Sequence, residues 1–166
     1  MIELAIRLFF IIIKAKTMQH TETRYSQYSP RQLFDLVMNI ESYPNFLPWC
    51  AAARILSRDK NISFAELVVS FKAFSDRYTS KIEHSNGDSL CEISVEQTEG
   101  PFKYLKNMWK FELDPITSQT KIDFTIDFCF KSSLMQKMVG LVFERALIAM
   151  MSAFEARAKK VYEQIR

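Results

Sequence analysis

Hydrophobic and polar residues change their spacing twice along the chain, and each spacing predicts a different kind of element. Residues 33–40 repeat apolar side chains every three or four positions, which is the spacing of one helix face. Between residues 51 and 130, apolar positions alternate with polar ones, as in strands that are buried on one side. Residues 133–162 contain no proline and are rich in Leu, Met, Ala, Lys and Glu, which favours a helix.

Capping and turn residues set the limits of the first elements. Ser29-Pro30 supplies an N-cap hydroxyl followed by proline at the first helical position, so we expect a helix to begin there. Residues 21–28, a short polar and aromatic stretch, are predicted to form a strand before it. Residues 43–49 contain two prolines and are predicted to form a turn or one short helical turn.

The later strands are separated by short turns that favour antiparallel pairing. Asn86-Gly87-Asp88 is typical of a hairpin turn, and Gly100-Pro101 and Asp114-Pro115 interrupt the chain again. The clearest alternation covers residues 122–130, where acidic and polar side chains occupy the expected outer face. Consecutive strands of this kind form an antiparallel meander, which makes the predicted fold class α+β.

The final helix, of nearly thirty residues, is apolar almost all round its first two-thirds. Such a helix needs more than one contact surface, and we expect it to cover the apolar face of the sheet. Phenylalanine and methionine side chains dominate this predicted interface. They suit either a packed core or a lipid-lined cavity, and composition leaves both alternatives open.

The first seventeen residues differ in composition from the rest. Their uninterrupted apolar run, residues 8–13, is shorter than the roughly 20 residues that span a bilayer. Lysines follow this run instead of preceding it, unlike the charges of a secretory signal. Three interpretations stay open: an artefact of the assigned start, with Met18 as the initiator; a surface anchor; or a helix packed on the domain. We therefore expect an apolar extension at residues 1–17 and one domain at residues 18–166.

Composition and charge exclude several classes of protein. The chain has 166 residues, of which 48% are hydrophobic, as expected for one domain with a filled core. Three scattered glycines exclude a phosphate-binding loop, and three distant cysteines indicate reduced thiols. Two histidines are too few for a histidine-rich metal site, so we expect no metal and no catalytic cofactor. Without the N-terminal extension the formal charge falls from +3 to +1, which argues against a DNA partner.

Four ordered blocks of the sequence carry a family resemblance. They are Tyr-Ser-Pro-Arg-Gln-Leu-Phe-Asp-Leu-Val at residues 28–37, Tyr-Pro-Asn-Phe-Leu-Pro-Trp-Cys at residues 43–50, Phe-Lys-Ala-Phe at residues 71–74, and Gly-Pro-Phe-Lys-Tyr-Leu-Lys-Asn-Met-Trp at residues 100–109. In these blocks the chain resembles the coenzyme Q-binding START-domain proteins and the ribosome association toxins. Both groups belong to the polyketide cyclase-like, helix-grip superfamily.

The resemblance implies a START/Bet v 1-like, helix-grip fold, in which a curved antiparallel sheet wraps around a long C-terminal helix. It also implies a lipid-binding domain whose ligand is ubiquinone or a related polyprenyl molecule. The implied role is support of respiratory electron transport, in the cytoplasm with transient contact to the inner membrane. A ribosome-associated toxin that blocks subunit association is the alternative, and a polyketide cyclase/dehydratase-like enzyme is the second alternative.

Strand parity and helix face select the residues that we expect to line a cavity. From the strands these are Phe71, Ile93, Val95, Trp109, Phe111, Phe124, Ile126 and Phe128, and from the final helix Met138, Leu141, Val142, Met150 and Phe154. The expected cavity mouth, where aromatic and basic side chains would meet a membrane surface, consists of Phe46, Trp49, Phe102, Lys103, Tyr104 and Lys106. Alternatively, these aromatic residues close the ends of the core.

Catalysis or ribosome binding would need other residues. Glu66 is a candidate acid or base if it is buried, but a solvent-facing position is the simpler interpretation. His84 is expected at an exposed turn, and Cys50 is expected to be structural because no neighbouring charge lowers its pKa. We therefore predict no catalytic residues. Ribosome binding would use basic residues such as Lys103, Lys106, Lys110, Arg157, Lys159 and Lys160.

Overall fold

The computed structural model describes residues 17–71 and 74–163. In these residues seven strands form one antiparallel sheet in the order β1-β7-β6-β5-β4-β3-β2. The strands are β1 (Met18–Ser26), β2 (Cys50–Asp59), β3 (Ile62–Phe71), β4 (Phe74–Asn86), β5 (Leu90–Glu99), β6 (Phe102–Leu113) and β7 (Thr120–Phe130). The helices are α2 (Pro30–Met38), the 3₁₀ helix η1 (Ile40–Asn45), α3 (Ser133–Gly140) and α4 (Phe143–Glu163).

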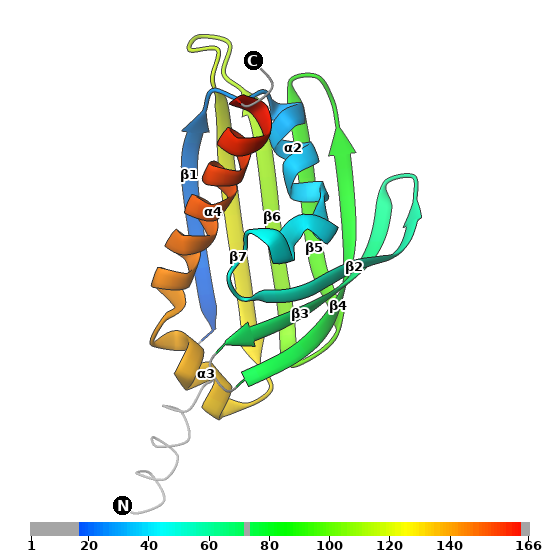
Figure 1. Ribbon diagram of the computed structural model, residues 1–166, viewed down its shortest axis with the longest axis vertical. Helices are drawn as coiled ribbons and strands as arrows, with labels where there is room; N and C mark the ends of the chain where they lie inside the picture. The colour runs from blue at the N-terminus through cyan, green and yellow to red at the C-terminus, as the bar shows by residue number, and fades with distance from the viewer. Residues whose placement is uncertain (1–16, 72–73, 164–166) are drawn as a thin grey trace, which may run out of the picture.

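The sheet is curved, and the helices cover one of its faces (Figure 1). Helix α4 runs beside β1 and β7, while α2 packs against β5, β6 and α4. Chain connectivity explains the strand order, because β2 to β7 follow each other as a meander and β1 adds to the far edge beside β7. This arrangement confirms the predicted α+β class and the helix-grip architecture.

Helix α2 begins where its capping residues predict. The Ser29 hydroxyl accepts a hydrogen bond from the Gln32 backbone amide, and the Gln32 side chain accepts one from the Ser29 backbone amide. Its apolar side chains, including Leu33 and Phe34, are buried against the sheet. The predicted short helical turn after it is η1, which contains Pro44.

The C-terminal segment is two helices instead of the single long helix that the sequence predicts. Helix α3 ends at Gly140, and the Val142 backbone amide donates to the Val139 carbonyl in the turn before α4. Glycine lowers helix propensity by about 1 kcal/mol relative to alanine, which favours an interruption there. The first strand also differs: β1 is Met18–Ser26 instead of residues 21–28.

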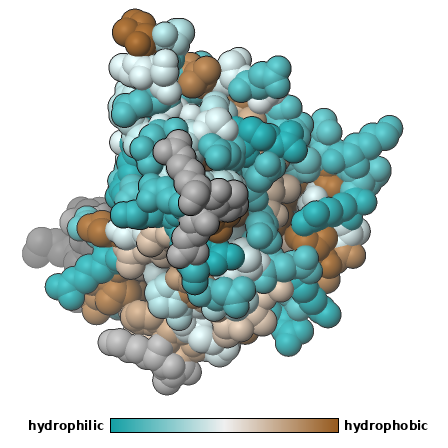
Figure 2. Space-filling model, turned by 45° about the horizontal axis from the view of Figure 1, so that its top comes forward, coloured by the Kyte–Doolittle hydropathy of each residue, from teal (hydrophilic) through white to brown (hydrophobic). Residues whose placement is uncertain are grey.

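Two clusters of buried residues stabilise the fold. The larger one joins α2, α4 and the inner face of the sheet, and includes Phe111, Phe124 and Ile93, each at most 1% exposed. The smaller one lies near α3 and consists of Met18, Phe102, Leu105, Phe128 and Phe130. Figure 2 shows hydrophilic residues over most of one outer face, with hydrophobic residues in separate small groups. The apolar side chains of the two clusters lie in the interior.

The predicted N-terminal apolar extension lies outside the described residues, except for Thr17. Within residues 17–71 and 74–163, no helix combines the length and hydropathy needed to cross a bilayer.

Candidate ligand-binding cavity

An apolar cavity of about 180 Å³ lies between the inner face of the sheet and the helices that cover it. We call it the main cavity, because most of the predicted cavity residues that the structure brings together line it. The sheet lines it with alternate residues, because every second side chain of a strand points to the same face. The sheet side consists of Leu67, Val69, Tyr78, Ser80, Ile82, Ile93, Val95, Leu105, Asn107, Trp109, Phe124 and Ile126. Cys50, the first residue of β2, also lines it. The opposite side consists of Val37, Met38, Ile40, Tyr43, Leu47, Trp49, Met150 and Phe154.

A second cavity, of about 240 Å³, lies next to the first, between α2, α4 and strands β1, β6 and β7. Val37, Trp109 and Phe154 line both cavities. The ring centroids of Trp109 and Phe154 are 5.5 Å apart, in an edge-on arrangement. These three side chains therefore form a partition between the two cavities.

Aromatic contacts hold this partition in place. Phe154 of α4 packs against Tyr43 and Phe46, at centroid distances of 5.5 and 5.2 Å. Trp109 of β6 packs against Phe124 of β7 at 4.4 Å. Because aromatic pairs in such geometries add to the free energy of burial, α4 is fixed to both η1 and the sheet around the cavity.

A few polar groups lie in the apolar wall. The Tyr43 hydroxyl donates to the Val37 carbonyl at 2.5 Å, and burial raises the pKa of the Tyr43 and Tyr78 hydroxyls far above the usual value, so both stay protonated. Ser80 Oγ and Asn107 Oδ1 are buried without a hydrogen-bond partner in the described part of the chain. Burial also raises the pKa of the Cys50 thiol, which agrees with the predicted structural role of this residue.

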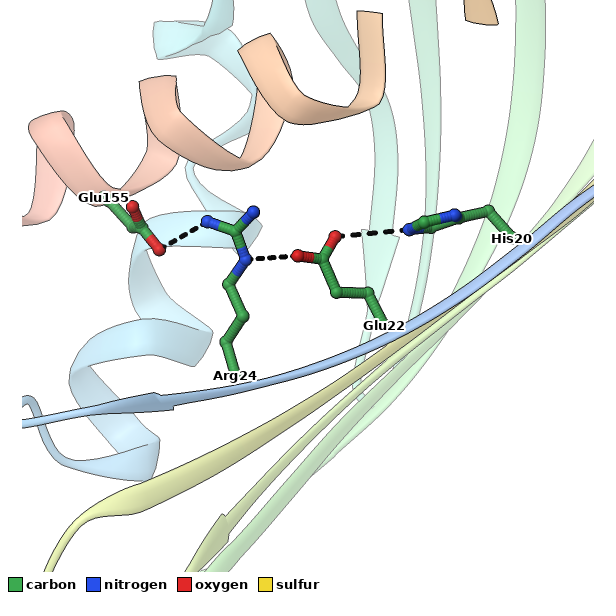
Figure 3. A network of polar contacts seen from close by, with 4 residues as sticks. All are labelled: His20, Glu22, Arg24 and Glu155. Carbon is green, nitrogen blue, oxygen red and sulfur yellow. Dashed lines mark hydrogen bonds and ion pairs between the residues drawn. The ribbon is translucent and has the colours of Figure 1, made fainter. Parts of the chain in front are cut away.

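An ion-pair network at the edge of the second cavity connects β1 to α4 (Figure 3). Arg24 Nε donates to Glu22 at 2.5 Å, and Arg24 Nη1 donates to Glu155 at 2.7 Å. His20 Nε2 lies 3.2 Å from the other oxygen of Glu22. Partial burial by itself raises the pKa of Glu22, but the hydrogen bonds from Arg24 and His20 hold it below the usual value. Glu22 is therefore charged at neutral pH.

Eight of the thirteen residues that the sequence predicts for the cavity line one of the two cavities. Ile93, Val95, Trp109, Phe124, Ile126, Met150 and Phe154 line the main cavity, and Phe111 lines the second one. Leu141 is 86% exposed, because the helix break turns it outward. Phe128 lies in the smaller core cluster. Neither cavity is lined by Phe71, at the end of β3, or by Met138 and Val142, which lie in and after α3.

The expected mouth residues do not form one surface. Trp49 lines the main cavity, and Phe46 packs on Phe154 beneath the guanidinium of Arg157. Phe102 is 8% exposed in the smaller core cluster, so the alternative, that it closes one end of the core, describes its position. On β6, Lys103 is exposed, the Tyr104 hydroxyl donates to Asp127, and Lys106 pairs with Glu96.

The candidates for chemistry lie away from both cavities or are held in other contacts. Glu66 points to the outer face, where it pairs with Arg54 at 3.0 Å and Arg77 at 3.6 Å. His84 corrects an expectation: it lies within β4 and not at an exposed turn, and its ring packs on Phe34 at 5.6 Å. Strand parity places it on the inner face, two residues from Ile82.

Several cavity residues were absent from the predicted set. Leu67 and Val69 follow the alternation of β3, so strand parity alone would identify them. Tyr43 and Leu47 lie in the segment with two prolines, where periodicity is no guide. Polar residues such as Ser80 carry no hydrophobic signal, although Ser80 shares the parity of Ile82 and Asn107 that of Trp109.

The basic residues considered for ribosome binding are divided between two faces. Lys106 and Lys110 lie on the outer face of β6, where they pair with Glu96 at 3.2 Å and Glu112 at 2.8 Å. Arg157, Lys159 and Lys160 belong to α4, which covers the opposite face. They form two separate groups, with Lys103 on the β6 side.

Comparison with known proteins identifies relatives over nearly the whole chain. The sequence model of the family described as "Polyketide cyclase / dehydrase and lipid transport" matches residues 26–155. The ribosome association toxin RatA of Rickettsia prowazekii is 42% identical over 144 residues, which cover 86% of this chain and 96% of that protein. The mitochondrial coenzyme Q-binding protein COQ10 homolog B of Xenopus laevis is 28% identical over 157 residues, covering 91% of this chain and 62% of that protein.

The fold also matches solved structures. A START superfamily protein from Mycobacterium smegmatis superimposes with a TM-score of 0.67, covering 86% of this chain and 98% of that one. Its sequence is only 18% identical, so the likeness concerns the fold.

Proposed function

This chain belongs to the polyketide cyclase / dehydrase and lipid transport family, in the group with the ribosome association toxin and coenzyme Q-binding proteins, and we propose that it binds a hydrophobic small molecule without transforming it. The proposed ligand is ubiquinone or a related isoprenoid quinone, and the proposed role is support of respiratory electron transport. The similarity to COQ10 homolog B, described as a coenzyme Q-binding protein, supports this choice of ligand.

The observation that carries the proposal is the apolar cavity between the sheet and the helices. A cavity of about 150 Å³ lined by aliphatic and aromatic side chains binds benzene in an engineered protein. The main cavity here, at about 180 Å³, therefore has room for one substituted six-membered ring. A polyprenyl tail of several units exceeds this volume, so most of the tail would lie outside the main cavity.

The environment of the tail decides how such a ligand is held. Each methylene moved from water into an apolar site contributes roughly 0.8 kcal/mol. A tail taken from a bilayer gains almost none of this, because lipid is as apolar as the cavity. Selective binding must therefore come from contacts to the ring and from the shape of its site.

Binding without catalysis agrees with the chemistry of the cavity wall. Tyr43 and Tyr78 are kept protonated by burial, and Glu66 is paired with arginines on the outer face. The family description includes cyclases and dehydrases, so a direct assay for cyclisation of an aromatic polyketide belongs beside the binding assay. We expect no turnover in that assay.

Fluorescence quenching tests the proposal, because Trp49 and Trp109 both line the main cavity. Ubiquinone with one isoprene unit, added in detergent-free buffer, should quench the tryptophan emission to saturation. In Val95→Phe, an added phenyl group occupies the cavity, and we expect affinity to fall at least about tenfold, or 1.4 kcal/mol.

Met108→Phe is the matched control, since Met108 is 47% exposed on the outer face of the adjacent strand. It should bind as the parent does. Quenching that does not saturate, or that is equal in the parent and Val95→Phe, would contradict binding in this cavity.

Ribosome association is the second candidate function, and the 42% identity to RatA of Rickettsia prowazekii favours it. Cosedimentation with ribosomal subunits, weakened by added salt, would support it. Charge reversal in the two basic groups then identifies the face in contact: Lys103→Glu with Lys106→Glu on β6, against Lys159→Glu with Lys160→Glu on α4. Binding that is unaffected by either pair would count against contacts through these residues.

A further inference from the structure

Two polar atoms in the wall of the main cavity have no hydrogen-bond partner in the described part of the chain. Ser80 Oγ belongs to a residue that is 1% exposed, and Asn107 Oδ1 is likewise excluded from solvent. Both residues line the main cavity, and most of their neighbours there are aliphatic or aromatic. A buried polar atom without a partner costs free energy, so these two atoms need a partner that the protein does not provide.

From these atoms we infer that Ser80 and Asn107 bind two oxygen atoms on opposite sides of a single six-membered ring, which enters the cavity ahead of any apolar tail. The inference rests on the proposed function and adds the residues that recognise the ligand and its orientation. The chemical class is a quinone or the corresponding quinol.

The sheet geometry separates the two polar residues by a suitable distance. Ser80 lies opposite Gln97 of β5, and Asn107 lies opposite Val95 of the same strand. They therefore flank β5 from either side and are offset by two residues along it, which places their Cα atoms about 12 Å apart across the sheet. One carbonyl group is too small to reach both, whereas a ring with an oxygen at each end spans the gap with a hydrogen bond of about 2.8 Å at each side.

The chemistry of the two side chains matches both redox states of such a ring. The Ser80 hydroxyl can donate to a carbonyl or accept from a hydroxyl. The Asn107 amide can present its oxygen to a hydroxyl or, turned over, its nitrogen to a carbonyl. Quinone and quinol would therefore bind in the same orientation.

The size of the cavity agrees with this orientation. At about 180 Å³ it holds one ring, and its polar atoms are in its wall, away from bulk solvent. A ligand that entered tail-first would place isoprene carbons against both polar atoms and leave them without partners.

Calorimetric titration of the full chain with two matched compounds tests the inference. The first is tetramethyl-p-benzoquinone, whose fully substituted ring has no free position for addition of the Cys50 thiol. The second is durene, the hydrocarbon with the same four methyl groups and no oxygen. A hydrogen bond contributes about fivefold in affinity, so the parent should bind the quinone about 25-fold more tightly than durene.

Ser80→Ala and Asn107→Leu should each reduce this preference about fivefold while leaving durene binding unchanged or slightly tighter. Ser80→Ala should also leave the free protein at least as stable, because it removes an unpaired buried hydroxyl. Ser85→Ala, an exposed position on the same strand, is the matched control and should change neither quantity.

Other results of these titrations would contradict the ring recognition, the role of Ser80 or the proposed function, as follows. If durene binds as tightly as the quinone, the two polar residues do not recognise the ring, although the cavity still binds apolar ligands. If Ser80→Ala destabilises the protein and leaves the preference intact, Ser80 has a structural partner. If neither compound binds the parent, the proposed function itself fails.

Discussion

At the scale of single residues, His84 shows how burial determines a response to pH. Its ring packs against Phe34, and its Nδ1 is buried without a hydrogen-bond partner among the described residues. Burial first, and then the charge of Arg58, lower the pKa of the imidazole from its ordinary value of 6.5. The folded protein therefore favours neutral His84, while the unfolded chain takes up a proton near pH 6.5.

We expect His84 to make the protein less stable as the pH falls through 6.5, because below this value the unfolded state binds a proton that the folded state resists. His84→Phe should remove this part of the pH dependence and keep the contact with Phe34. Urea unfolding at pH 7.5 and pH 5.5 measures the effect. Ser85→Ala, at the next and exposed position of β4, should keep the slope of the parent. An unchanged slope in His84→Phe would disprove the explanation.

Gly100 and Gly140, which lie in different surroundings, give a second prediction at this scale. Gly100 has φ +141°, and a Cβ there would lie 2.5 Å from the Cβ of Tyr78. Gly100→Ala should therefore lower the free energy of unfolding by about 2 kcal/mol or more. At Gly140 the nearest atom to a new Cβ is the methyl group of Met18, at 3.8 Å, so Gly140→Ala should be neutral or stabilising by up to about 1 kcal/mol. Chemical denaturation that finds equal losses for both would contradict this contrast.

At the scale of elements, the Arg24 network is what joins the edge strand β1 to α4 by charge. Arg24 contacts Glu22 on its own strand and Glu155 on the helix. Partial burial lowers the pKa of Arg24, but these two carboxylates raise it overall, so the guanidinium stays charged. The network therefore helps to hold α4 against β1 at the edge of the second cavity.

Glu22→Gln should destabilise the protein at pH 7 by about 1 kcal/mol or less, as for a partly exposed ion pair. The folded pKa of Glu22 lies below 4.5, so its contribution is complete above that value and is lost as the pH falls through the folded pKa. The difference from the parent should therefore shrink in unfolding experiments at acid pH. Glu96→Gln, in the exposed pair with Lys106, is the control; a difference that grows at low pH would reverse the sign that we assign.

Most elements were predictable because their signals are local. Alternation identified the strands that pair in the meander, and the Ser29 cap identified the start of α2. The break after Gly140 was not predicted, because the apolar pattern continues through it and a single glycine is tolerated inside many helices. Polar cavity residues such as Ser80 were missed for a similar reason, because only the folded sheet shows that their partners are absent.

At the scale of the whole molecule, the protein encloses its cavities by bending one sheet around α2 and α4 (Figure 1). The main cavity takes side chains from all these elements and from η1, so its shape depends on the complete fold. A ligand that binds the folded state only should stabilise the entire domain.

We expect ubiquinone with one isoprene unit, at about 100 times its Kd, to raise the free energy of unfolding by about 2.7 kcal/mol. Differential scanning calorimetry would record this as a higher Tm that increases with ligand concentration. Val95→Phe should show little of the shift at the same concentration. A Tm that does not change with ligand in the parent would disagree with a cavity that binds it.

The most direct test of the central claim is the mass spectrum of an organic extract from gently purified protein. If the cavity between sheet and helices holds an isoprenoid quinone, the extract of the parent should contain one in near-stoichiometric amount. The extract of Val95→Phe, prepared in parallel, should contain far less, and that of Met108→Phe as much as the parent. A parent extract without quinone, or equal amounts from the parent and Val95→Phe, would contradict the account.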